Sequence, residues 1–150
     1  MNKYSQINDI ISRFDKQGSM LNEYEEIRVS DFLHTGSYLF NAHISGSLFG
    51  GLPVPKAMCI AGDPKTGKSY LLFNICREAQ KNGYFLWLIE TEGSPDKTRL
   101  ENQGIQLDKA RISQPDTISE VQSMVLPVLK HILKEPPEKR PKIIIAIDSI

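Results

Sequence analysis

The sequence is poor in cysteine, in net charge and in long apolar runs. Its two cysteines, Cys59 and Cys76, lie among apolar neighbours, so we interpret both as small core residues of a reducing compartment and exclude a disulfide framework. The 18 basic and 18 acidic side chains cancel, and the total charge therefore indicates neither a nucleic-acid nor a membrane partner. No apolar run approaches the roughly 20 residues of a membrane helix. The start "MNKYSQINDI" also lacks the apolar region of a signal peptide, so we expect a cytoplasmic protein.

Segments with strand character alternate with segments of helical periodicity over most of the chain. The predicted strands are "KAMCIAG", "YFLWLIE" and "IIIAIDSI", and the unbroken apolar character of the second predicts burial on both faces. Helices are predicted at about residues 3–17 and 37–45, from Lys68 to a stop at Gly83, at about 95–103, and from a capping box at Thr117 and Glu120 onward. This alternation predicts an α/β fold with a mostly parallel sheet and helices on both faces.

The first predicted helix carries Ile7, Ile10, Ile11 and Phe14 at helical spacing. Two interpretations stay open: this apolar face docks on the protein's own core, or it contacts a neighbouring subunit. The stretch "YEEIRVSDFL" that follows mixes charged and apolar residues without a clear period, and it predicts no element. The sequence therefore predicts an N-terminal helical segment followed by a stretch without a predicted element; the boundary between residues 1–29 and 30–150 comes from a resemblance given below.

The segment "GDPKTGKS" matches the phosphate-binding pattern G-x-x-x-x-G-K-[ST] in full. Glycines at its bends permit successive backbone N–H groups to point at a phosphate, and the helix that begins at Lys68 adds its positive end. Lys68 supplies a charge for the β- and γ-phosphates, and Ser69 supplies a hydroxyl ligand for Mg²⁺. The alternative is a plain strand-turn-helix corner, in which Lys65 is solvated and does not touch phosphate. The predicted nucleotide-binding residues of the loop are Gly62, Asp63, Pro64, Lys65, Thr66, Gly67, Lys68 and Ser69.

Acidic residues stand at the ends of two predicted strands, where α/β sheets bind ligands. Asp148 ends "IIIAID" and is predicted to hold Mg²⁺, the alternative being a helix cap. Ser149 is either a hydrogen-bond partner near the γ-phosphate or a cap. Glu90 and Glu92 are two positions apart, so both side chains can point to one side of an extended segment. A glutamate there would polarise an attacking water, the alternative being two exposed carboxylates at a loop edge.

Further motifs accompany these residues. The phosphate loop, "ETEG", "QPDT" at 114–117 and "IIIAIDSI" stand in the order and approximate spacing of the RecA/RadA recombinases, which include the phage UvsX type, and the chain resembles that family over residues 30–150. The lead-in "TGSYLFNAHISGSLFGGLP" is similar to the family's segment before the loop. The resemblance implies a RecA-like P-loop NTPase core.

The resemblance also implies roles for single residues. It makes Glu92 the catalytic base, with Lys68 as its catalytic partner at the phosphates. It assigns the metal to Ser69 and Asp148, and it places Tyr70 near a nucleotide contact. Glu90 departs from the pattern, because the family usually has Asp at that position.

RecA/RadA recombinases are ATP-dependent DNA strand-exchange proteins. The resemblance therefore implies ATP and Mg²⁺ as cofactors, a homo-oligomeric filament on single-stranded DNA, and a cytoplasmic location, which is the host cytoplasm if a phage encodes the chain. Two other functions stay open. One is a RecA-fold ATPase of another branch, such as a replicative helicase or a KaiC-like regulator. The other is a non-catalytic nucleotide-binding regulator in which Glu92 is idle.

Several parts of that family lie beyond its counterpart of Asp148. They are the DNA-binding loops, the γ-phosphate sensor, and a strand that the family inserts between the phosphate-loop strand and the Asp148 strand. We therefore expect a core that is incomplete at its C-terminal end and poorly stable in isolation, because a central strand would lack a hydrogen-bonding partner.

Overall fold

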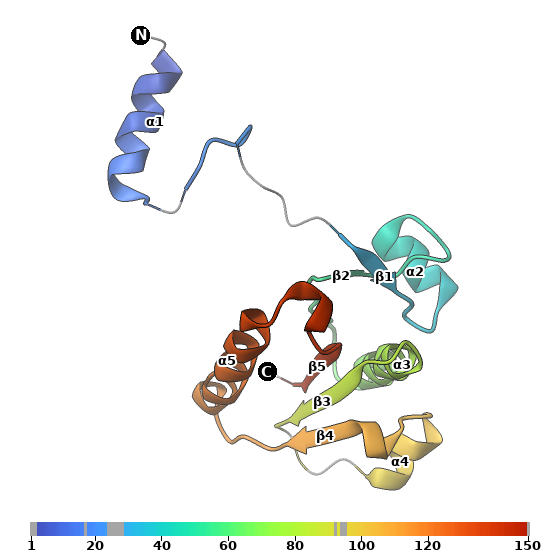
Figure 1. Ribbon diagram of the computed structural model, residues 1–150. Helices are drawn as coiled ribbons and strands as arrows, with labels where there is room; N and C mark the ends of the chain where they lie inside the picture. Colours follow the sequence, from blue (N-terminus) through green and yellow to red (C-terminus); the bar gives the residue numbers. More distant parts are fainter. Residues whose placement is uncertain (1–2, 17, 24–28, 92, 94–95, 150) are drawn as a thin grey trace.

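The computed structural model describes residues 3–16, 18–23, 29–91, 93 and 96–149 (Figure 1). Its helices are α1 (Lys3–Phe14), α2 (Tyr38–Ser45), α3 (Lys68–Lys81), α4 (Lys97–Asn102) and α5 (Ile118–Lys134). Its strands are β1 (Asp31–Leu33), β2 (Leu52–Val54), β3 (Phe85–Glu90), β4 (Ala110–Ser113) and β5 (Ile143–Asp148). Short 3₁₀ turns at Leu107–Lys109 and Pro137–Lys139 precede β4 and β5. None of the described helices is long and apolar enough to cross a membrane.

A parallel sheet with the strand order β4-β3-β5 forms the centre of the core (Figure 1). Because side chains alternate along a strand, Leu86 and Leu88 of β3 face one side, where they pack against α3. Trp87 and Ile89 face the other side, where they pack against α5. The predicted α/β class, with a parallel sheet and helices on both faces, is confirmed, as is the burial of the central strand on both faces.

The α3 helix runs as its apolar spacing predicts. Ile75, Cys76 and Ala79 recur at helical spacing and are buried. The helix ends just before Gly83, whose φ of 82° is a left-handed conformation that glycine adopts without steric cost. At the other end, α3 begins at Lys68, directly after the phosphate-binding pattern.

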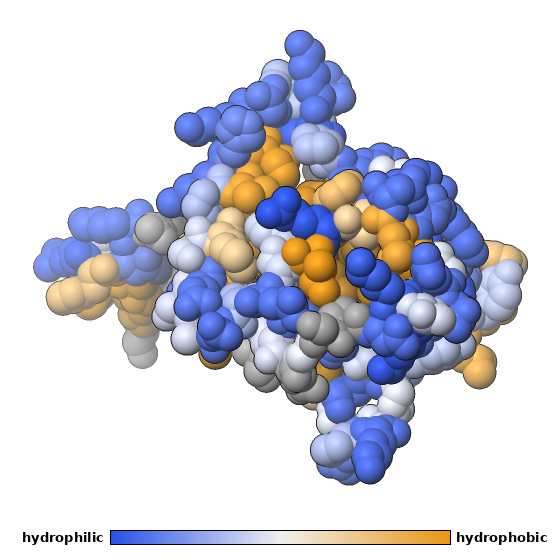
Figure 2. Space-filling view, turned by 90° about the horizontal axis from the view of Figure 1, so that it is seen from below, coloured by the Kyte–Doolittle hydropathy of each residue, from blue (hydrophilic) through white to orange (hydrophobic). Residues whose placement is uncertain are grey.

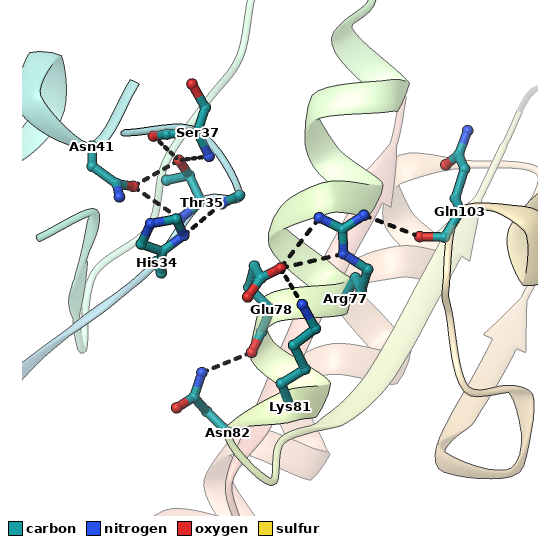
Figure 3. Close-up of polar contacts among 10 residues, drawn as sticks. His34, Thr35, Ser37, Asn41, Arg77, Glu78, Lys81, Asn82 and Gln103 are labelled. Atoms are coloured by element: carbon teal, nitrogen blue, oxygen red, sulfur yellow. Dashed lines mark hydrogen bonds and ion pairs between the residues drawn. The ribbon is translucent and has the colours of Figure 1, made fainter. Parts of the chain in front are cut away.

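A small unit precedes the phosphate loop and consists of α2 with the antiparallel pair β1–β2, which packs on α3 through Leu33. A buried polar network stabilises it (Figure 3): the Asn41 Oδ1 accepts from the Thr35 backbone N–H at 2.9 Å and from the Thr35 hydroxyl at 2.7 Å. The Asn41 amide donates to the Leu48 carbonyl at 2.9 Å. Both Thr35 and Asn41 are fully buried, so their polar groups depend on these partners. The α2 helix agrees with the prediction for residues 37–45, whereas neither β1 nor β2 is predicted.

The prediction of a buried strand at "KAMCIAG" is wrong. Residues 56–62 belong to no strand, because no described strand pairs with them. The segment is only half-buried: Met58 and Ile60 pack toward α3, whereas Cys59 is exposed. The interpretation of Cys59 as a core residue is therefore wrong as well, while Cys76 is buried as predicted. In the parallel sheet, β5 pairs with β3 and with no other described strand.

The α1 helix does not dock on the described core, which corrects the first interpretation of its apolar face. Ile7, Ile10 and Ile11 are 47%, 55% and 54% exposed, and Phe14 is 86% exposed. Figure 1 shows α1 standing apart from the sheet, and in Figure 2 the same segment protrudes at the left edge with apolar residues along one side. The helix ends at Phe14, where the sequence predicts residue 17.

Candidate nucleotide site

The phosphate-binding pattern folds into a loop between residue 62 and the start of α3. The Thr66 hydroxyl donates to the Asp63 carbonyl at 2.8 Å, which closes a turn around Pro64 and Lys65. Lys65 itself has a φ of 66°, an unusual conformation for a residue with a side chain. Gly67, with a φ of 91°, turns the chain into the helix. All the loop residues from Gly62 to Gly67 are exposed, as a ligand-binding loop must be.

The start of α3 is suited to an anion. Gly67 precedes the helix and provides no side-chain cap, so the first backbone N–H groups of this 14-residue helix keep their capacity to bind a phosphate. At this end of α3 the Lys68 ammonium donates to the Gly62 and Asp63 carbonyls, at 2.9 Å each. Lys68 therefore bridges the two ends of the loop with its charge inside it. Tyr70 lies two residues further along α3 and is 58% exposed.

Two of the predicted metal residues meet, although 79 positions separate them. The Ser69 hydroxyl on α3 donates to the Asp148 Oδ1 at the end of β5, at 3.1 Å. Among the described residues, no group of three or more His, Cys, Asp and Glu could hold a metal ion. A hydroxyl with one carboxylate suits Mg²⁺, which usually takes one or two protein ligands and completes its shell with water and phosphate oxygens. The residues present thus fit a magnesium–nucleotide complex.

Glu90 is buried, at 8% exposure, so the alternative of an exposed loop-edge carboxylate is wrong for this residue. It ends β3 as the direct register partner of Asp148. The positions two residues earlier, Leu88 and Ala146, pack against the core beside α3, and alternation therefore directs Glu90 and Asp148 to that same face. Glu92 lies outside the described residues, so its predicted position near the γ-phosphate stays a prediction.

The opposite face of the sheet has its own polar group at the strand ends. The Thr91 hydroxyl donates to the Ser149 carbonyl at 2.6 Å, and both residues line a cavity of about 240 Å³. Asp116 and Thr117 of the "QPDT" motif line it from the start of α5. Thr117 caps α5 by accepting from the Glu120 N–H at 3.2 Å. The sequence predicts that cap, but it gives no signal for the cavity, which depends on how α5 packs.

The buried Cys76 thiol, near Asp148, is unreactive. Burial, together with the charge of the nearby Asp148, raises the pKa of the Cys76 thiol to about 12. The thiol therefore stays protonated at any physiological pH, and it acts as a small apolar side chain.

Polar contacts cluster at the C-terminal end of α3, some within the helix and some to the segment after α4 (Figure 3). The Glu78 carboxylate accepts from Lys81 at 2.8 Å and from Arg77 at 3.2 Å, and Arg77 also reaches the Gln103 carbonyl after α4. Burial alone would raise the pKa of the Glu78 carboxyl, but the hydrogen bonds and charges of Lys81 and Arg77 outweigh burial and lower it. Buried Gln80 adds three bonds, two to carbonyls and one from the Gln106 N–H. The bonds of Arg77 and Gln80 thus join the C-terminal half of α3 to residues 103–109.

Comparison with known proteins shows which family the chain resembles. The model of the RecA N-terminal domain matches residues 3–132. The chain is similar to protein RecA of Mycoplasmopsis pulmonis, with 32% identity over 113 residues, which is 75% of this chain and 32% of that protein. Protein RecA of Methylococcus capsulatus is 30% identical over 121 residues, or 77% of this chain and 34% of that protein. Protein RecA of Colwellia psychrerythraea is 38% identical over 68 residues, or 45% and 20%. The chain thus spans about a third or less of these relatives.

Proposed function

Because the chain belongs to the RecA N-terminal domain family, we propose that it forms the ATP- and Mg²⁺-binding part of a DNA strand-exchange recombinase of the phage UvsX type. The Ser69–Asp148 contact beside the uncapped start of α3 is the observation that carries this proposal. It joins the first turn of α3, directly after the phosphate-binding pattern, to a carboxylate at the end of β5. A plain strand-turn-helix corner would give no reason for that contact.

Each residue of the site has a proposed task. The loop N–H groups and the Lys68 ammonium bind the β- and γ-phosphates, and Ser69 with Asp148 would hold Mg²⁺. Magnesium, when bound, offsets negative charge on the phosphates. Glu92 orients the attacking water and takes its proton, which makes it the proposed catalytic base. The proposed nucleotide contacts are Gly62, Asp63, Pro64, Lys65, Thr66, Gly67, Lys68, Ser69 and Tyr70.

We propose that residues 1–29 connect subunits of a filament and that residues 30–150 form the first part of the ATPase core. The exposed apolar face of α1 supports a subunit contact, because isolated helices rarely keep such a face in water without a partner. A second copy of the chain supplies such a partner in a head-to-tail filament. Single-stranded DNA is the proposed polymer that the filament covers, a proposal that rests on the resemblance alone.

The proposal is tested by ATP hydrolysis with and without single-stranded DNA. We expect DNA-stimulated turnover that Glu92→Gln abolishes while ATP binding survives, and Lys68→Ala should weaken binding itself. Lys81→Ala is the matched control, since this lysine lies at the far end of α3, pairs with Glu78 and should leave both nearly unchanged when removed. Turnover that Glu92→Gln leaves intact would refute the role of this residue.

Two further outcomes separate the alternatives. ATP binding without any hydrolysis would indicate a non-catalytic regulator. Hydrolysis without strand exchange would indicate another branch of RecA-fold ATPases.

A further inference from the structure

We propose that the segment between α5 and β5 is a contact for single-stranded DNA, which holds the strand by its phosphates and by a stacked base. We call residues 134–142 the basic connector. The contact goes beyond the proposed nucleotide site and does not need it. Only the choice of DNA as the bound polymer rests on the proposed function.

The basic connector has an excess of positive charge that the whole chain lacks. Its sequence, "KEPPEKRPK", contains four cations and two acids, whereas the chain as a whole has 18 of each. The four cations are Lys134, Lys139, Arg140 and Lys142, and all of them are exposed. No described carboxylate forms an ion pair with any of the four. Such a cluster attracts a polyanion, because binding releases the counter-ions condensed on the phosphates.

The basic connector holds its cations in place before a ligand binds. Three prolines among its nine residues fix backbone angles. The Arg140 guanidinium donates to the Glu135 carbonyl at 2.9 Å and to the Leu133 carbonyl at 3.2 Å. Both partners are neutral, so these bonds orient a group that suits phosphate and leave its charge uncompensated. The end of α5 favours positive charge and would explain one cation, but Lys139 and Lys142 lie beyond that end.

An exposed aromatic ring lies at the end of the basic connector. Phe85 begins β3 and is 43% exposed, and its N–H donates to the Lys142 carbonyl at 2.9 Å. Because Leu86 packs toward α3, alternation directs the Phe85 ring to the opposite face of the sheet. Unpaired bases stack on such rings whatever their sequence, whereas the bases of a duplex already stack on one another. Charge and ring together therefore favour a single strand.

The proposed contact lies at the opposite end of β5 from the candidate nucleotide residues. The basic connector precedes Ile143, whereas Asp148, six residues into the strand, bonds to Ser69. At about 3.3 Å per residue, the two ends of β5 lie roughly 20 Å apart. Figure 1 shows the basic connector as the red segment that crosses from α5 to the start of β5. Nucleotide binding and DNA binding can therefore be measured separately.

The experiment measures binding of a fluorescent oligothymidine to the full 150-residue chain, without nucleotide, over a series of salt concentrations. The test variant is Lys139→Gln with Lys142→Gln. Each phosphate contact of a single strand contributes about 0.7 to the slope of log affinity against log salt, so the slope should flatten by about 1.4. The same relation makes binding at about 0.1 M salt roughly 25-fold weaker. Phe85→Leu should weaken binding about fivefold at an unchanged slope, because stacking releases no counter-ions.

Lys97→Gln with Arg99→Gln is the matched control. It removes two exposed cations from α4, which lies beside β4 and away from the basic connector (Figure 1). This variant should keep the affinity and the slope of the wild type. Equal slopes in the two double variants overturn the inference, and so does a wild-type chain that binds no oligothymidine.

Two further measurements test the choice of ligand. A duplex bound as tightly as the single strand, or wild-type affinity in Phe85→Leu, overturns the preference for a single strand. Tighter binding to phosphatidylcholine vesicles that contain phosphatidylserine, if lost in Lys139→Gln with Lys142→Gln, overturns DNA as the ligand. ATP binding should be the same in all these variants. A wild-type chain that binds no ATP overturns the proposed function, which is a distinct result.

Discussion

Replacing Gly51 with alanine should break open the unit that precedes the phosphate loop. Gly51 has a φ of 139°, and a Cβ built there lies 2.2 Å from the Leu33 carbonyl oxygen and 3.1 Å from the Asn41 Oδ1. The first contact is with the backbone of β1, which cannot move without leaving β2. We add about 1–2 kcal/mol for the backbone conformation to about 2 kcal/mol for overpacking, and expect Gly51→Ala to cost about 3–4 kcal/mol.

Gly46→Ala is the matched comparison. Gly46 also has a positive φ, 74°, at the end of α2, but nothing lies within 4 Å of its built Cβ. The substitution should therefore cost only the conformational strain of about 1–2 kcal/mol. The two variants differ in the clash and in little else.

Native-state hydrogen exchange by mass spectrometry measures the difference locally. A loss of about 3 kcal/mol corresponds to roughly 100-fold faster exchange of amides that open with this unit. We expect Gly51→Ala to remove most protection over residues 31–33 and 52–54, and Gly46→Ala to lower it only about 5- to 30-fold. Equal protection of these residues in the two variants would refute the steric argument.

Three other predictions concern the core. At pH 8 a thiol reagent should modify exposed Cys59 and spare Cys76, whose pKa of about 12 keeps it protonated; mass spectrometry of the labelled peptides checks this. Trp87→Phe loses the 2.9 Å bond to the Ser113 hydroxyl and should lower the temperature midpoint of unfolding, whereas Ser113→Ala should lower it less because no ring volume is lost. The 150-residue chain alone should unfold in urea with low stability, since β5 has a single neighbour among the described strands; a cooperative transition of ordinary stability would contradict this.

The long buried elements could be predicted from the sequence because each carries its own signal. Unbroken apolar runs predict β3 and β5, apolar residues at helical spacing predict α3, and a capping box predicts α5. The phosphate loop was predictable for the same reason, since its whole pattern lies within eight consecutive residues.

The missed strands lack such signals. The strands β1 and β2 have three residues each, and Pro53 stands in the middle of β2, which argues against a strand when only the sequence is known. β4 has four residues with charged Arg111 among them. The segment at 56–62 shows the opposite error, because apolar residues predict burial but cannot supply the neighbour that makes a strand.

The single residues of the candidate site could be predicted from the sequence, but the contacts between them could not. Spacing predicted that Ser69 and Asp148 share a task, but their contact depends on how the sheet packs on α3. The burial of Glu90 was beyond prediction for a related reason. The face on which Glu90 lies depends on its register with β5, which the sequence does not give.

The two halves of the site differ in how far apart their residues lie along the chain. The Lys68 bonds to Gly62 and Asp63 close a loop of a few residues, whereas the Ser69–Asp148 bond closes one of 79. Short loops close at a lower entropy cost and in far less time than long ones. The proposed phosphate-binding half should thus form early in folding and survive partial opening, while the proposed metal-binding half exists only when α3, β3 and β5 are assembled. Magnesium dependence, and not nucleotide affinity, then reports whether this core is intact.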